Sequence, residues 1–313
     1  MTCLGSNKKT CAHRWLNLLS AGSLMAALTA CPSVVHPPPV PPVVAPLAGP
    51  ELPRGGRTLF PDYELVGFCG TPGAPALGEL TGNLPKKAEK LELFANKYTG
   101  SRKVLPVFEL IAVVVLAGPG GDGKYRRRVD DATVDQYLLL ARQHRALLLL
   151  NIQPGQSDFI TEVKHFEKYL REPDVGVALD PEWAMKPGQV PGKYFGQTTG
   201  TRINEVGEYL SALIAGLHLP EKALVFHQVN GSVVKDEPTL NSSPGVVVIK
   251  SVDGLGPKAA KKLTYNYLMG IMTPGVHPGF KLFFDEDQRN GGTLMTPEEV
   301  MALAPRPEYV MYE

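Results

Sequence analysis

The chain has 313 residues, of which 43% are hydrophobic and 20% charged, and its formal net charge at pH 7 is +1. A near-neutral chain gives no support for a nucleic-acid partner, and its one basic cluster, residues 124–128, lies beside Asp130 and Asp131, as expected of a solvated loop. Of its four cysteines only Cys69 lies beyond residue 31, which excludes a disulfide within any domain that begins later.

The first 30 residues are expected to be a signal peptide. Basic side chains between residues 8 and 14 precede an apolar stretch over residues 15–30, which is short for a membrane span. Residues 28–31 (LTAC) resemble the bacterial lipoprotein signal, in which the cysteine, here Cys31, is lipidated and becomes the first residue of the mature chain. A plain secretory signal with an incidental cysteine is the alternative.

Residues 31–60 are expected to join the lipidated Cys31 to a folded domain over residues 61–313. The segment is rich in proline and valine and should stay extended as a semi-rigid spacer. We therefore predict a protein anchored by lipid to the outer face of a cell membrane, without spanning it.

Eight apolar runs in the domain predict β-strands. Each run ends in polar residues and is followed by a helical segment or a Gly/Pro turn. The runs are residues 63–71, 104–112, 146–153, 175–182, 223–228, 246–253, 280–287 and 309–313.

Helical segments alternate with these strands. Amphipathic spacing predicts helices over residues 86–98, 134–144, 158–170, 203–217 and 258–268, and Thr296-Pro297-Glu298-Glu299 predicts one more helix start. This alternation predicts an α/β fold, a single (β/α)8 TIM-barrel-like domain whose last helix is missing, with residues 43–60 as a segment that could cover that gap. An open doubly wound sheet is the alternative, but no Gly-x-Gly-x-x-Gly follows the first strand.

The run from Val175 to Trp183 (VGVALDPEW) is the most informative stretch. Its bulky aliphatic residues alternate with small ones, which is typical of a strand buried on both faces. Pro181 should end the strand, and Asp180 and Glu182 then lie at its carboxyl end. Two acids in such a place are costly unless they are paired or used.

In a barrel of this kind the active site lies at the carboxyl ends of the strands. The polar residues there are mostly carboxylates and amides, with aromatic residues among them. The candidate catalytic residues are Glu182, Asp180, Glu109 and Asp285, and the candidate substrate-binding residues are Trp183, Gln153, His227, Gln228, Asp253 and Tyr312.

Such a set of residues favours a carbohydrate site. Cleavage of a glycosidic bond needs one protonated acid and one ionised carboxylate. Glu182 is the expected acid, because burial beside Trp183 and the like charge of Asp180 would raise its pKa, and Asp180 would stay ionised and orient it. Glu109 or Asp285 would supply the second carboxylate. No cofactor is expected, and no pair of histidines has metal-ligand spacing.

An Asp-x-Glu motif at the end of the fourth strand resembles the barrel glycoside hydrolases of the chitinase and lysozyme-type muramidase families. That resemblance implies that Glu182 is the proton donor and Asp180 its helper. The chain departs from the chitinase pattern of further upstream aspartates at Val175 and Ala178, and from the muramidase pattern where Cys69-Gly70-Thr71 ends the first strand. The domain from FCGTPG to RPEYVMYE is also similar to a group of bacterial exported lipoproteins, a likeness that carries no activity with it.

The leading hypothesis is a glycoside hydrolase that acts on a cell-wall or extracellular glycan. A non-catalytic glycan-binding or envelope-structural lipoprotein is the alternative, and a cation-dependent phosphodiesterase with Glu109, Asp180, Glu182 and Asp285 as oxygen ligands is a weaker one. Structural roles also stay open for two residues: Glu109 could pair with Lys250, and His227 could be a satisfied core histidine.

Overall fold

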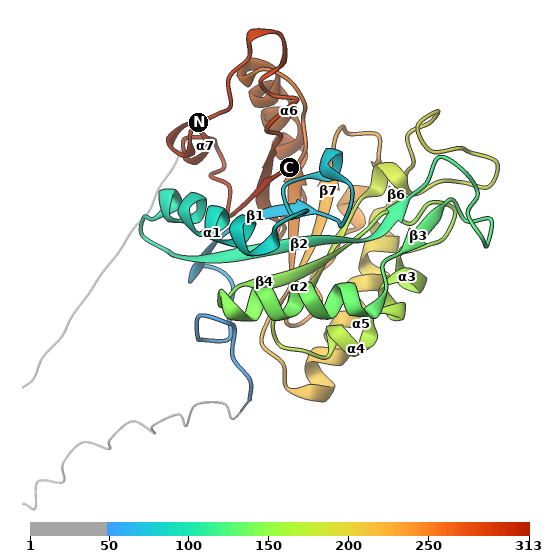
Figure 1. The fold of residues 1–313 in the computed structure, drawn as a ribbon, viewed down its shortest axis with the longest axis horizontal. Coiled ribbons are helices and arrows are strands. Elements are labelled where there is room, and N and C mark those ends of the chain that lie inside the picture. The colour runs from blue at the N-terminus through green and yellow to red at the C-terminus, as the bar shows by residue number, and fades with distance from the viewer. Residues whose placement is uncertain (1–48) are drawn as a thin grey trace, which may run out of the picture. The chain divides into compact units, whose positions relative to one another are not determined.

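The computed structural model describes residues 49–313, so the signal peptide, Cys31 and most of the Pro-rich segment lie outside the described residues. Eight parallel strands form one sheet, and pairing of the first strand with the second closes it into a barrel (Figure 1). The predicted TIM-barrel-like fold is therefore confirmed. The barrel strands are β1 (Tyr63–Gly70), β2 (Lys103–Val115), β4 (Leu147–Ile152), β5 (Val175–Leu179), β7 (Lys222–Gln228), β9 (Val246–Val252), β10 (His277–Leu282) and β11 (Tyr309–Tyr312).

Helices connect most of these strands and cover the outside of the barrel (Figure 1). They are α1 (Leu84–Ala95), α2 (Asp131–Gln143), α3 (Phe159–His165), α4 (Glu167–Leu170), α5 (Gly200–Leu217), α6 (Lys258–Gly270) and α7 (Pro297–Met301). The predicted helix start at Thr296 is a complete capping box with Glu299. No described helix is long and apolar enough to cross a membrane.

Short elements complete the carboxyl end of the barrel. The strand β3 (Arg126–Arg128) pairs antiparallel with the extension of β2, and β6 (Thr198–Thr199) pairs with β8 (Val234–Lys235). The 3-10 turn η3 (Pro181–Trp183) directly follows β5. The polar groups at the ends of the strands are thus enclosed by short loop elements.

Alternation along the strands divides the apolar residues into two cores. Side chains such as Leu65, Val107 and Leu149 fill the barrel interior, whereas their neighbours Val66, Phe108 and Leu150 pack against the helices. Because a strand exposes successive side chains on opposite faces, the apolar runs noted above are buried on both sides.

Residues 49–60 close the amino-terminal end of the barrel. Leu52 and Leu59 are buried and pack with Tyr63 in the interior core. The guanidinium of Arg54 donates a hydrogen bond of 3.0 Å to the carbonyl oxygen of Val104. This segment therefore covers one end of the barrel and not the side from which the last helix is missing.

One predicted strand is displaced along the chain. The sequence placed it at residues 280–287, but β10 runs from His277 to Leu282. The strand begins earlier because His277 already pairs with Ile249 of β9. It ends earlier because the carboxylate of Asp287 accepts the N–H of Phe283 at 3.0 Å and draws the chain into a turn.

Candidate functional site

Polar side chains from seven strands meet inside the carboxyl end of the barrel. Most of them follow the apolar interior residues of their own strands by the alternation described above, whereas Tyr309 is the first residue of β11 and faces inward from there. We call these residues the polar cluster: Glu109, Asn151, Gln153, Asp180, Glu182, His227, Ser251, Asp253, Lys281, Tyr309 and Glu313.

Amide groups hold Asp180 on one side of the polar cluster. The Nδ2 atom of Asn151 donates to Oδ1 of Asp180 and to Oε1 of Glu109, both at 2.9 Å. The Nε2 atom of Gln153 donates to Oδ2 of Asp180 at 3.0 Å, while its Oε1 accepts the N–H of Val115 at 3.1 Å. Both oxygens of Asp180 are thereby fixed in place.

His227 lies between two carboxylates. Its Nδ1 is 2.9 Å from Oδ2 of Asp253, and its Nε2 is 3.1 Å from Oε1 of Glu109, at an angle that does not make a hydrogen bond. Burial lowers the pKa of His227, but Asp253 and Glu109 outweigh burial and hold it well above its ordinary value. Burial likewise raises the pKa of each carboxylate, and the imidazolium outweighs it, so both pKa values are lowered. These three groups are therefore charged at neutral pH.

Lys281 supplies the second cation. Its ammonium lies 2.6 Å from Oε2 of Glu313 and 3.5 Å from Oδ2 of Asp253. The thiol of Cys69 donates to Oε2 of Glu313 at 3.4 Å. Burial raises the pKa of this thiol well above its ordinary value, so Cys69 is a neutral donor and not a nucleophilic thiolate.

Glu182 differs from the other carboxylates of the cluster. Its Oε2 is buried and accepts no hydrogen bond from any described residue. Burial, then Asp180, then Asp253 raise the pKa of Glu182 well above its ordinary value. Burial also raises the pKa of Asp180, although the positive charges of His227 and Lys281 oppose the shift. Burial and the neighbouring charges therefore favour the neutral form of Glu182, and Asp180 beside it is also harder to ionise than usual.

The carboxylates lie below the surface. The exposed fraction is 0% for Glu109, 4% for Asp180 and 8% for Glu182, so Glu182 is the nearest of the three to solvent. Trp183 follows it and is half-buried. Of the whole cluster, Glu313 is more exposed than Glu182, with 20% of its side chain accessible.

Four residues predicted for the site lie outside the polar cluster, one of them Trp183, which is half-buried after Glu182. Asp285 is exposed on the loop after β10, because that strand ends earlier than predicted, and it lines a cavity of about 230 Å³ that includes Glu313 but none of Glu109, Asp180 and Glu182. Tyr312 lies on the outer face of β11, where its hydroxyl bonds to that of Tyr98 at 2.5 Å. Gln228 is fully buried on the opposite face of β7 from His227, and neither atom of its amide has a hydrogen-bond partner among described residues.

The expected partner of Glu109 is also different. Lys250 binds Glu237 at 2.8 Å, not Glu109. Glu109 instead accepts a short hydrogen bond from the hydroxyl of Tyr309, besides its contacts with Asn151 and His227.

The sequence-based choice of site residues missed five members of the polar cluster: Asn151, Ser251, Lys281, Tyr309 and Glu313. A lysine within an apolar run was the available signal for Lys281, of the same kind that marked Glu109. Tyr309 and Tyr312 both lie in the last strand, and the sequence did not show which of them faces inward.

Comparison with models of protein families, with curated proteins and with solved structures gives no significant match to this chain. Within residues 49–313, no group of three or more His, Cys, Asp or Glu side chains is arranged to hold a metal ion. The chemistry of the site is therefore argued from its own geometry.

Proposed function

We propose that this domain is a glycoside hydrolase in which Glu182 is the general acid. The observation that carries the proposal is the state of Glu182: buried, with a raised pKa, and with an oxygen that no described residue binds. A carboxylic acid kept neutral beside a second carboxylate is the arrangement that protonates a glycosidic oxygen. The Asp-x-Glu resemblance to chitinase and muramidase-type barrels supports the same assignment.

The other groups fit the remaining needs of the reaction. As the glycosidic bond breaks, positive charge develops on the sugar ring, and negative charge in the site stabilises it. Glu109 keeps its charge because of His227, and Asp180 is held by the amides of Asn151 and Gln153. Asp180 positions the acid and raises its pKa, and Glu109 supplies the fixed negative charge.

The location of the protein completes the proposal. Lipid on Cys31 would tether the domain to the outer face of a membrane, where cell-wall and extracellular glycans are its accessible substrates. Trp183, half-buried next to Glu182, offers an aromatic face for stacking against a sugar.

Release of reducing ends from a panel of glycans, including peptidoglycan, tests the proposal. The full chain should release them, and Glu182→Gln should lower the rate by about 10²- to 10⁴-fold, the usual contribution of a general acid. Glu208→Gln, which removes an exposed carboxylate from α5, is the matched control and should keep the rate. Equal rates for wild type and Glu182→Gln would contradict the assignment.

The burial of the carboxylates favours a second candidate, a glycan-binding or envelope-structural protein without turnover. Such a protein would keep the charged network of Glu109 and His227 for stability alone. It would release no reducing ends from any glycan, and Glu182→Gln would leave glycan binding unchanged.

The phosphodiesterase alternative has less support. It needs four carboxylates around one cation, but Asp285 is exposed on a loop and lines a different cavity. Glu109 is already bound by Tyr309, Asn151 and His227.

A further inference from the structure

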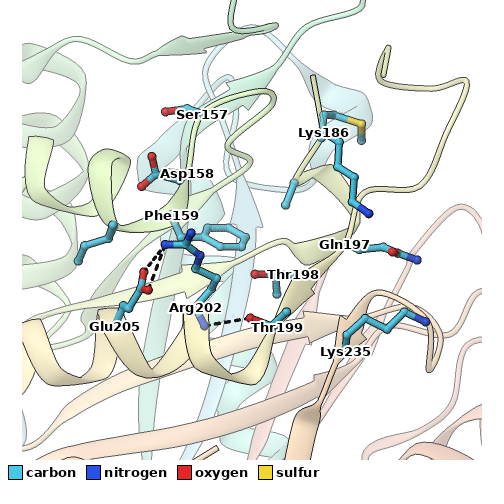
Figure 2. Close-up of a pocket in the computed structure, with 13 residues that line it drawn as sticks. Ser157, Asp158, Phe159, Lys186, Gln197, Thr198, Thr199, Arg202, Glu205 and Lys235 are labelled. Carbon is cyan, nitrogen blue, oxygen red and sulfur yellow. Dashed lines mark hydrogen bonds and ion pairs between the residues drawn. The ribbon is translucent and has the colours of Figure 1, made fainter. Parts of the chain in front are cut away.

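A cavity of about 420 Å³ lies beside the candidate acid, at the same end of the barrel. Its wall is built by the segment that follows Glu182, by the start of α5 and by the β6–β8 pair (Figure 2). The polar residues that line it are Ser157, Asp158, Lys186, Gln197, Thr198, Thr199, Arg202, Glu205 and Lys235, and the apolar ones are Phe159, Ile160, Ala184 and Met185.

Both carboxylates of this cavity already have partners. The oxygens of Glu205 accept from Nη1 of Arg202 at 3.0 and 2.9 Å. Asp158 caps α3, with its two oxygens bound by the N–H and the hydroxyl of Thr161, each at 2.9 Å. Neither carboxylate therefore needs a cation from a ligand.

The two lysines of the cavity, in contrast, are unpaired. Within residues 49–313, neither Lys186 nor Lys235 forms an ion pair, and both are exposed. Figure 2 shows Lys186, Gln197 and Lys235 along one side of the cavity, with Arg202 and Glu205 on the other. The start of α5, capped by Thr199, also faces the cavity, and its dipole favours an anion.

The wall of the cavity is built partly from residues that neighbour the candidate acid in the chain, although Glu182 itself does not line it. The chain leaves Glu182 through Ala184 and returns so that the N–H of Gly196 donates to the carbonyl oxygen of Glu182 at 2.6 Å. The N–H of Gln197 donates to the carbonyl oxygen of Ala184 at 3.0 Å. Residues that line the cavity thus flank Glu182 along the chain and through hydrogen bonds.

We propose that this cavity binds the carboxylate of an acidic glycan, and that Lys186 and Lys235 select for it. The apolar floor formed by Phe159 and Met185 suits the carbon skeleton of a sugar, and Gln197 can bond its hydroxyls. This inference rests on the proposed function for the identity of the ligand as a glycan. It adds that the preferred glycan carries a negative charge on the sugar that occupies this cavity.

Binding, measured without cleavage, tests the inference. The probes are hexasaccharides of hyaluronan and of alginate and the peptidoglycan disaccharide-tetrapeptide, each as the free acid and as its methyl ester. Calorimetry on the full chain should show tighter binding of at least one free acid than of its ester, by about tenfold for contacts with two ammonium groups. The double variant Lys186→Gln/Lys235→Gln should lose that difference.

Lys193→Gln is the matched control, because Lys193 is exposed on the same loop and does not line the cavity. It should keep the preference for the free acid. Three outcomes would overturn the inference. The wild type could bind acid and ester equally, the double variant could keep the preference for the free acid, or no acidic probe could bind at all. Cleavage of neutral glycans without acid preference would overturn it and leave the proposed function standing. Lysine-dependent binding of an acidic probe without cleavage of any glycan would support the inference and contradict the proposed hydrolase function.

Discussion

At the scale of single residues, Asp180 and Glu182 form a pair whose pH dependence can be tested. Asp180 is, after burial, the largest cause of the raised pKa of Glu182. An acid catalyst must be protonated, so the rate should fall as the pH rises through the pKa of Glu182. Asp180→Asn removes the neighbouring negative charge while keeping an oxygen for the amide of Asn151.

We therefore expect Asp180→Asn to move the alkaline limb of the pH–rate profile to lower pH, by about one unit or more. Profiles of kcat/KM for the wild type and the variant would measure the shift. An alkaline limb that stays in place would show that Asp180 does not control the protonation of Glu182. A lower rate with an unchanged profile would assign Asp180 a purely positioning role.

The pair and some of its neighbours, such as His227, were readable from sequence, whereas the contacts among them were not. Pro181 marks the end of the strand, and this local signal placed both acids correctly relative to β5. His227, Lys281 and Tyr309 reach the same site from three other strands, and their contacts depend on the register between strands. Register is set by packing across the barrel, which a single sequence does not display.

At the scale of an element, the neighbours of β5 leave no space for a side chain at Gly176. A Cβ atom on Gly176 would lie 2.7 Å from Cδ2 of Leu149 and 2.8 Å from the carbonyl oxygen of Ala223. The backbone oxygen cannot move without disturbing the neighbouring strand β7. A residue without a side chain is therefore required at this point of the barrel interior.

Gly176→Ala should accordingly lower the free energy of unfolding by about 1–3 kcal/mol, the usual cost of overpacking a core. Urea denaturation of the full chain would measure the change. Gly216→Ala is a control that should change the free energy of unfolding in the opposite direction. Gly216 is exposed in α5, and no atom lies near the Cβ that alanine would add. Because alanine is the better helix former, this variant should be more stable by about 0.5–1 kcal/mol. A neutral Gly176→Ala would mean that β5 is less confined than its geometry implies.

The end of the strand β10 is an example of a boundary that the local sequence does not determine. Hydrophobicity favours a strand at the run FKLFF and predicts its end in the acidic residues that follow. In the structure Asp287 turns back onto Phe283 and also pairs with Lys261 of α6 at 3.0 Å. This contact between distant segments ends β10 early and leaves Asp285 on an exposed loop, while Lys281 takes the inward position.

At the scale of the whole molecule, the barrel was predictable because each strand carries its own evidence. Eight runs alternating with helices leave few other architectures, and the carboxyl ends of such strands converge by topology. The closure of the opposite end was not predictable in the same way. Proline-rich composition favours an extended spacer, yet Leu52 and Leu59 at its carboxyl end are buried in the barrel interior.

This closure allows a test of whether residues 49–60 are only a spacer or are part of the folded domain. Leu59 is fully buried and packs with the interior residues of the barrel, and its N–H donates to Oε2 of Glu221 at 2.6 Å. Loss of a buried leucine side chain leaves a cavity, so Leu59→Ala should lower the free energy of unfolding by about 2–5 kcal/mol. In a domain of this size each kcal/mol corresponds to a fall in Tm of about 2–4 °C.

Thermal unfolding of the full chain would measure that fall, with Leu93→Ala as the control, because 68% of Leu93 is exposed on α1. If residues 49–60 served only as a spacer, the two variants would unfold at the same temperature as the wild type. A large fall for Leu59→Ala alone would show that the tether and the barrel share one core. The boundary between linker and domain would then lie before Leu52, and any soluble form of the protein would have to keep this segment.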